Sequence, residues 1–375
     1  MILRALGSTL LVCLVATTSL AMAQSAEEVS GRDPDGESGG RLPGGDESRE
    51  SGGKLPPKQG ADDNERERTY PFLPRSHVYY GTPVGSEGNR ENLIFATEYA
   101  LHVPLVNQLR RAAFSGSESA WSVTLSFRGD LRMVTDDSLP VRMPSYKPGV
   151  TVQYFRIVQK ETPWLLGTRI GFYHFSNGQE DCTFGSDAPD SSAACTDAWT
   201  SLSDPQAELN RTSGEFSTNR LVFGFDVLRA ERGKHGDAVR TISFGLTYEQ
   251  NVAGKVGGIN ERIRSLFGVG KLHGYFECAS GAGAGQLRTR GELAWYPRSD
   301  RYPDGLVNDV PVLSGSAEIA YYPAWRWLGS TGVFVRLISG RDYYNAFFVD
   351  DVTQFQIGVT ADSSRPLRFR GPTRR

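Results

Sequence analysis

The sequence lacks a long apolar run after its first residues, and it lacks an excess of charge of either sign. Between residues 24 and 375 no segment approaches the ~20 consecutive apolar residues that a membrane-spanning helix needs. If the chain crosses a membrane, it must therefore do so as a closed β-barrel. The 41 Lys and Arg residues nearly balance 43 Asp and Glu residues, for a formal net charge of -2. This balance excludes the strongly basic composition that is typical of nucleic-acid binding.

Cysteine is also scarce, with four in 375 residues. Cys182 and Cys195 bracket the polar, acidic segment CTFGSDAPDSSAAC. An exported protein meets oxidising conditions, so we expect these two residues to form a disulfide that closes a loop. Cys13 lies in the N-terminal apolar segment, and we expect Cys278 to be a buried thiol outside any disulfide.

The N-terminal region has the layout of an export signal. Arg4 precedes an apolar segment from Leu10 to Leu20, which Ala21-Met22-Ala23 follows. These are the basic start, apolar core and small-residue cleavage site of a secretory signal, and we predict one over residues 1–23. Residues 24–68 are rich in Gly, Ser, Pro and charge and cannot bury enough apolar surface to fold, so we expect a low-complexity disordered tail.

The rest of the chain alternates apolar and polar residues in segments of about ten, separated by clusters of Gly, Asp, Asn and Pro. A period of two predicts β-strands. We predict one domain over residues 69–362 and a C-terminal extension over 363–375. The twelve predicted strands are 76–82, 92–105, 120–134, 147–160, 164–177, 216–230, 239–252, 271–281, 286–298, 311–323, 330–341 and 353–361.

The two faces of these strands decide between two all-β architectures. In 239–252 one face carries Phe244 and Leu246 while the other carries Ser243 and Thr247. A secreted sandwich would alternate too, but segments of about ten residues with Tyr and Trp at their ends match an outer-membrane barrel wall and its aromatic girdles. We therefore predict a twelve-stranded antiparallel transmembrane β-barrel in the outer membrane of a Gram-negative cell.

Charged residues on the polar faces are expected to fill the barrel interior as structural groups. The set comprises Arg169, Arg288, Arg290, Glu292, Glu318 and Arg336. The histidines outside the segment discussed next show no metal-ligand spacing, and we expect them at the surface or in a girdle. They are His77, His102, His235 and His273.

The segment GFYHFSNGQ, residues 171–179, raises a question of chemistry. Counting by twos puts His174 and Ser176 on the apolar, outward face of the strand, where polar side chains are costly unless they are satisfied or functional. A hydroxyl and an imidazole on one face can act as nucleophile and base. Asn219 falls on the outward face of the next predicted strand near the same rim, where its amide can orient the imidazole.

Two blocks of sequence resemble a known family. YHFSNGQ resembles the His-x-Ser-Asn-Gly signature of the outer-membrane phospholipase A family, and STNRL resembles its later Asn-Arg segment. The segment SLPVRMPSYKP, residues 138–148, resembles the family's Ser-x-Pro-x-Arg-x-x-x-Tyr-x-Pro block in the same register. The resemblance covers roughly residues 76–362. It implies that Ser176 is the nucleophile, His174 its general base and Asn219 the group that orients His174.

The resemblance also implies a metal and a partner. Family members are twelve-stranded barrels that hydrolyse phospholipid acyl esters, are activated by homodimerisation and bind Ca²⁺ at the dimer interface. Ser138 matches a ligand donated by the partner subunit, and the carbonyl of Gln179 matches another. At the family's third ligand position this chain has Glu215 where the family has serine, and a carboxylate is a better ligand for a hard cation than a hydroxyl.

Two other functions remain open at this stage. A lipid A deacylase is the nearest enzymatic alternative, because some of those barrels also carry a His-x-Ser-Asn motif; the block at 138–148 favours the phospholipase. A porin or adhesin-like barrel with an incidental His-Ser pair is the alternative from another class. A charged, packed interior would make a twelve-stranded barrel a poor porin.

Overall fold

The computed structural model describes the barrel strands and a few of the residues that adjoin them. The expected signal peptide, tail and C-terminal extension lie outside these residues, so they stay predictions. Within the described part of the chain, no helix is long and apolar enough to cross a membrane. The described residues are 72–84, 93–109, 118–135, 141, 144–158, 162–176, 184–185, 188–189, 197, 217–232, 238–252, 268–282, 285–297, 312–323, 330–342, 344 and 351–362.

Each of the twelve expected strands is present, with ends within three residues of the prediction. The barrel strands are β1 (Ser76–Pro83), β2 (Leu93–Asn107), β3 (Ser119–Val134), β4 (Ser145–Val158), β5 (Trp164–Ser176), β8 (Ser217–Arg232), β9 (Ala238–Asn251), β10 (Gly270–Ala282), β11 (Gly285–Trp295), β12 (Leu313–Pro323), β13 (Thr331–Arg341) and β14 (Asp351–Ala361). Two further strands, β6 (Phe184–Gly185) and β7 (Ala188–Pro189), pair with each other as a separate small sheet. The sequence did not predict this pair.

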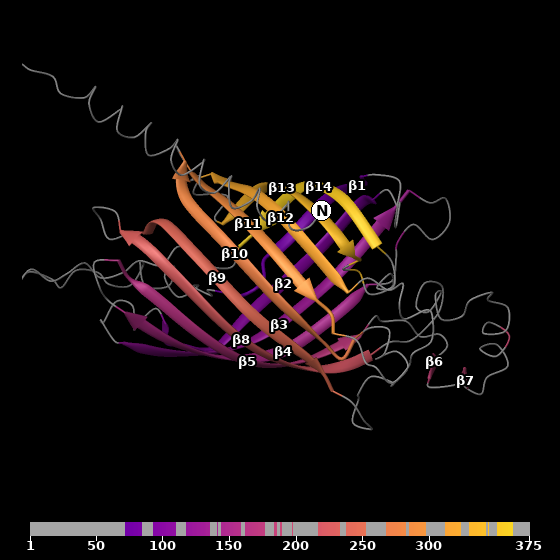
Figure 1. Cartoon of the computed structure of the whole chain (residues 1–375), viewed down its shortest axis with the longest axis horizontal. Coiled ribbons are helices and arrows are strands. Elements are labelled where there is room, and N and C mark those ends of the chain that lie inside the picture. The colour runs from indigo at the N-terminus through magenta and orange to yellow at the C-terminus, as the bar shows by residue number, and fades with distance from the viewer. Residues whose placement is uncertain are drawn as a thin grey trace, which may run out of the picture.

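The strands close into a single antiparallel barrel (Figure 1). Each strand pairs with its neighbours in chain order, with β5 next to β8 because β6 and β7 lie outside the barrel. Pairing of β1 with β14, from Ser76 opposite Ala361 to Pro83 opposite Gln354, completes the circle. Closure leaves no barrel strand with an unpaired edge. The predicted fold class, a closed all-β barrel of twelve antiparallel strands, is confirmed in these features.

The polarity of the two faces is also as predicted, with apolar side chains outside. On β14 the side chain of Ile357 is 51% exposed while that of Gln356 is 0% exposed. On β9 Phe244 and Leu246 are exposed while Ser243 and Thr247 are buried. The molecule therefore has an apolar outer wall and a polar interior, the reverse of a water-soluble globular domain.

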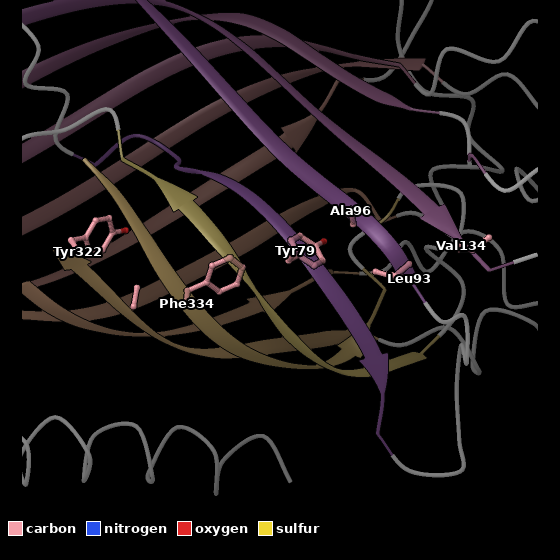
Figure 2. Close-up of a cluster of buried hydrophobic side chains, with 7 residues drawn as sticks. Tyr79, Leu93, Ala96, Val134, Tyr322 and Phe334 are labelled. Carbon is pink, nitrogen blue, oxygen red and sulfur yellow. The ribbon is translucent and has the colours of Figure 1, made fainter. Parts of the chain in front are cut away.

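The interior holds both an apolar cluster and a set of ion pairs. Figure 2 shows the cluster, in which the rings of Tyr79 and Phe334 meet edge to face at 6.2 Å between centroids. Its members are Tyr79, Leu93, Ala96, Val134, Ala320, Tyr322 and Phe334. The ion pairs join strands across the barrel, as in the pair of Arg336 with Glu98. The charged residues that were expected to fill the interior do so as members of ion pairs, most of them with partners outside that set, such as Arg169 with Asp226.

The prediction that these histidines lie at the surface or in a girdle is wrong for the three that the structure describes. His77 is buried, with its Nε2 atom 3.2 Å from Oε2 of Glu318, and Nε2 of His273 lies 3.3 Å from Oε2 of Glu292. His102 contacts the buried hydroxyl of Ser126 at 2.9 Å. These histidines share the parity of polar neighbours, and in a closed barrel that parity faces inward. His235 lies outside the described residues.

The strand directions divide the loops between two rims. The rim at the ends of β1, β3 and β5 carries the long connections 84–92, 135–144, 177–216, 252–269, 296–312 and 342–350. The opposite rim carries the connections 159–163, 233–237, 283–284 and 324–330 and the longer 108–118, together with the start of β1 and the end of β14. We call these the long-loop rim and the terminal rim. In outer-membrane barrels the short turns face the periplasm and the long loops face outside.

The residues just before β1 cross the interior at the terminal rim. The carbonyl oxygen of Phe72 accepts a hydrogen bond from Arg169 at 2.8 Å, and that of Pro74 accepts one from His102 at 3.1 Å. The Arg75 guanidinium donates to Glu277 and, at 3.2 Å, to Asp362. We call Phe72–Arg75 the strap. Its contacts reach β2, β5, β10 and the residue after β14, so it ties together strands that are far apart around the barrel.

The strap generates a stability prediction. Replacing Arg75 with Met leaves the carboxylates of Glu277 and Asp362 short of one cation in the barrel interior, and breaking a buried pair in this way costs roughly 3–5 kcal/mol. We expect Arg75→Met to lower the free energy of unfolding by about 3 kcal/mol in urea titrations of protein refolded in detergent. The matched control is Arg156→Met, because Arg156 and its partner Glu118 are 57% and 74% exposed. An equal loss of unfolding free energy in the two variants would contradict the conclusion that the strap stabilises the barrel.

Candidate active site on the outer wall

The candidate catalytic residues lie on β5 and β8, which run side by side in the barrel (Figure 1). The register places His174 directly opposite Asn219 and Ser176 directly opposite Ser217. Ser176 is the last residue of β5 and Ser217 the first of β8, so the group lies at the long-loop rim. Residues opposite one another on antiparallel strands have Cβ atoms about 5 Å apart, which is close enough for their side chains to interact.

The group faces outward, as the alternation predicted. His174 is exposed, while its neighbours Tyr173 and Phe175 point inward and are each 6% exposed. The stripe of outward side chains that leads to it along β5 and β8 is apolar and includes Ile170, Phe172, Leu221 and Phe223. The polar group thus stands at the end of an apolar stripe on the outer wall.

A hydrogen bond fixes the histidine ring. Nδ1 of His174 lies 2.9 Å from Oδ1 of Asn219. An amide oxygen can only accept, so the proton of this bond belongs to Nδ1, and in the neutral ring Nε2 keeps its lone pair. Ser176 follows His174 on the same outward face, because side chains at i and i+2 of a strand share a face. The arrangement supplies a hydroxyl, a ring nitrogen that can take its proton, and a group that sets the tautomer.

The expected metal ligands cannot be placed in the same way. Ser138, Gln179 and Glu215 all lie outside the described residues, and so do Cys182 and Cys195 with their expected disulfide. Among the residues that the structure describes, no group of three or more His, Cys, Asp or Glu side chains could hold a metal ion. Cys278 is buried, as expected, and forms no disulfide with another described residue. Calcium and the disulfide therefore stay predictions.

The structure adds one feature that the sequence reading missed. Tyr146 on β4 lies directly opposite Ser176, on the side away from β8. The rings of Phe127 and Tyr146 stack at 6.3 Å, and those of Tyr99 and Phe127 lie 5.7 Å apart, which makes a row of aromatic rings across β2, β3 and β4. A Cβ at Gly129 would overlap the Tyr99 hydroxyl, so any other residue at 129 would displace this ring. Counting the alternation along residues 145–158 as well, and considering both strands that neighbour β5, would have predicted Tyr146 beside Ser176.

Comparisons with known proteins give a likeness to other barrels. No family model matches the sequence, and no curated protein matches it. Among solved structures, outer membrane phospholipase A from Escherichia coli is 13% identical, with a TM-score of 0.45 over 77% of this chain and 97% of that chain. The outer membrane phospholipase dimer of Salmonella typhi with bound calcium is 14% identical, with a TM-score of 0.44 over 80% and 96%. LpxR from Salmonella typhimurium is 8% identical, with a TM-score of 0.30 over 77% and 99%. Likeness at this level assigns the chain to no family.

The hydrogen bond to Asn219 predicts the tautomer of His174. In ¹⁵N spectra of histidine-labelled protein, recorded where the ring is neutral, we expect the Nδ1–H form, because the acceptor at Nδ1 selects it. Asn219→Leu removes the acceptor and should abolish this preference, whereas Asn219→Asp keeps an acceptor and should retain it. His174→Ala identifies the signal. A wild-type ring in the Nε2–H form would contradict the geometry.

Proposed function

We propose that this chain is an outer-membrane barrel enzyme that hydrolyses the acyl esters of phospholipids, with Ser176 as nucleophile, His174 as general base and Asn219 as the group that orients His174. One observation carries the proposal. A histidine on the outer wall is held by an amide through the nitrogen that catalysis does not need, with a serine next to it on the same face. A structural role for the same three side chains would not require this order along the wall.

The distribution of polarity supports a membrane location. An apolar outer wall around a charged interior is stable in lipid and exposes large apolar area in water. The predicted export signal and the two unequal rims agree with an outer-membrane barrel whose long loops face outside the cell. The candidate active site then lies at the outer end of the wall, where the ester region of the outer leaflet meets it.

The reaction needs only the groups on this wall for its proton transfers. The Ser176 hydroxyl oxygen attacks the ester carbonyl while Nε2 of His174 takes the hydroxyl proton. The imidazolium then gives that proton to the departing alcohol oxygen as the acyl–serine ester forms. Water, deprotonated by the same nitrogen, releases the fatty acid and restores Ser176. Asn219 holds the ring throughout but, lacking charge, stabilises the imidazolium less than a carboxylate would.

Calcium dependence and activation by dimerisation belong to this proposal and rest on the sequence resemblance. The expected ligands are a serine hydroxyl, a main-chain carbonyl and a carboxylate, and Ca²⁺ prefers oxygen donors of these kinds. Ser138, Gln179 and Glu215 belong to connections that leave from the same rim as the candidate active site. When bound, the ion would supply positive charge near the developing oxyanion.

We expect Ser176→Ala and His174→Ala each to lower phospholipid hydrolysis by at least about 10³-fold, because each removes a reacting group. Both side chains lie on the outer wall, so circular dichroism and thermal unfolding should stay at wild-type values. Asn219→Ala should lose less, since it removes orientation and not a reacting atom. The assay uses refolded protein with purified phospholipid and, separately, purified lipid A.

The matched control for this series is Thr168→Ala, which deletes an outward hydroxyl on the same face of β5 away from the site. It should hydrolyse phospholipid at the wild-type rate. Wild-type turnover by Ser176→Ala would exclude Ser176 as the nucleophile. Hydrolysis of lipid A in preference to phospholipid would leave the proposed catalytic residues unchanged but would identify lipid A as the substrate.

The calcium part of the proposal has its own test. Chelator and high dilution in detergent should both reduce specific activity, and added Ca²⁺ should restore it by favouring the dimer through mass action. Ser138→Ala should raise the Ca²⁺ concentration needed for half activity, and Glu215→Gln should raise it more, because it removes the charged ligand. Activity that is unchanged in chelator and at every dilution would show that neither calcium nor the dimer is needed for catalysis. The proposed role of Ser176 as nucleophile would be unaffected by that outcome.

A further inference from the structure

The barrel interior contains a cavity of about 450 Å³. Its wall is formed by inward side chains of the strands together with all four residues of the strap. Cavities of a few hundred Å³ are the size of small-ligand sites in proteins. The cavity lies on the opposite side of the wall from the candidate active site, so any ligand it holds is separate from the proposed lipid substrate.

Most charged side chains around this cavity form an ion pair with a side chain of opposite charge. Arg336 pairs with Glu98, and Arg169 donates to Asp226 at 2.8 Å. Arg290 pairs with Glu292 and also lies 3.2 Å from Glu277. Charges in a poorly hydrated interior are tolerated because such partners offset the loss of hydration. These ion pairs are therefore accounted for by a structural role in the barrel interior.

One part of the cavity near the long-loop rim departs from this pattern. Lys147 and Arg220 approach the same oxygen, Oε2 of Glu249, at 2.9 and 3.2 Å. Arg128 and Lys271 also line the cavity, and within the described residues neither forms an ion pair with a carboxylate. Arg128 lies within electrostatic range of the other three cations. We call Arg128, Lys147, Arg220 and Lys271 the lumen cation cluster.

The other groups that face the cluster do not cancel its charge. Asp130 is near Arg128 and Lys147, and Glu292, which is paired with Arg290, acts on Lys271 together with Glu249. Lys271 lies over the ring of Tyr296 at 5.6 Å, and Arg341 lies over the same ring at 4.4 Å, which adds a cation. Lys147 and Arg220 lie over the rings of Tyr173 and Phe175. Aromatic faces attract cations but carry no net charge.

Like charges gathered in a confined interior repel one another strongly unless an anion is present. Guanidinium and ammonium groups that converge on a cavity offer charge-assisted hydrogen bonds of the kind that bind phosphate and carboxylate. We propose that the lumen cation cluster is a binding site for a small oxyanion of the phosphate class, held between Arg128, Lys147, Arg220 and Lys271 inside the barrel. The proposal is independent of lipid hydrolysis.

Titration calorimetry of the refolded full chain tests the site, with inorganic phosphate as the probe in detergent at low ionic strength. We expect saturable binding that chloride at matched ionic strength does not reproduce. Arg128→Gln and Lys271→Gln each remove a cation that forms no ion pair within the described residues, so neither substitution breaks an ion pair. Each should weaken phosphate binding by about tenfold or more, because a hydrogen bond to a charged group contributes roughly 1.5–3 kcal/mol.

The matched control is Arg156→Gln, which removes one positive charge from an exposed position and should leave the phosphate affinity unchanged. Circular dichroism checks that each variant is folded. Absence of saturable phosphate binding by the wild type, or an equal affinity in wild type, Arg128→Gln and Lys271→Gln, would overturn the proposal. A second set of titrations uses micelles doped with phosphatidic acid. Binding of this lipid that depends on Lys271, without binding of free phosphate, would identify a lipid headgroup as the ligand. Because inorganic phosphate has no acyl ester, a failure of phosphate to bind would leave the proposed hydrolase unaffected.

Discussion

Closure of the barrel is the constraint on which the other features depend. A closed antiparallel sheet satisfies the backbone hydrogen bonds of every strand, and it gives each strand one face toward the interior and one toward the outside. Because the period of a strand is two, a single residue of register decides which side chains meet which environment. The pairing of β1 with β14 therefore fixes the polarity of the whole molecule.

The two faces of β5 and β8 show how one register supports two chemistries. Outward, His174 and Asn219 form a hydrogen bond on an apolar wall. Inward, the intervening residues Tyr173 and Arg220 lie opposite one another and line the cavity. His174 and Asn219 are paired with each other across β5 and β8, and Tyr173 and Arg220 are paired in addition with β4 and β9. A site on paired strands keeps its geometry better than a site on loops.

The sequence was sufficient to predict the strands and their polarity because both depend on local alternation. It placed His174 and Ser176 on the outward face of one strand and Asn219 on that of the next, where the structure has them in register. It failed for His77 and His273, which were expected at the surface, because their partners Glu318 and Glu292 come from other strands and only closure brings them together. The strap was not predicted for the same reason, because Phe72 and Arg75 belong to no periodic pattern and form their contacts across the barrel interior.

The expected calcium ligands show the other limit of a sequence-based prediction. Ser138, Gln179 and Glu215 belong to connections between strands, and connections have no period from which a side-chain direction can be counted. Tyr146 was missed for a different reason. Its position beside Ser176 depends on the register between β4 and β5, which a single strand does not contain.

The central claim, that Ser176 is a nucleophile activated by His174 on the outer wall, is tested most directly by covalent labelling. A fluorophosphonate with an alkyl chain reacts with an activated serine and leaves unactivated serines unmodified. Peptide mapping of the refolded protein after labelling should find the phosphonyl group on Ser176, and the label should be lost in His174→Ala. A protein that stays unlabelled, or one labelled at another serine, would contradict the claim.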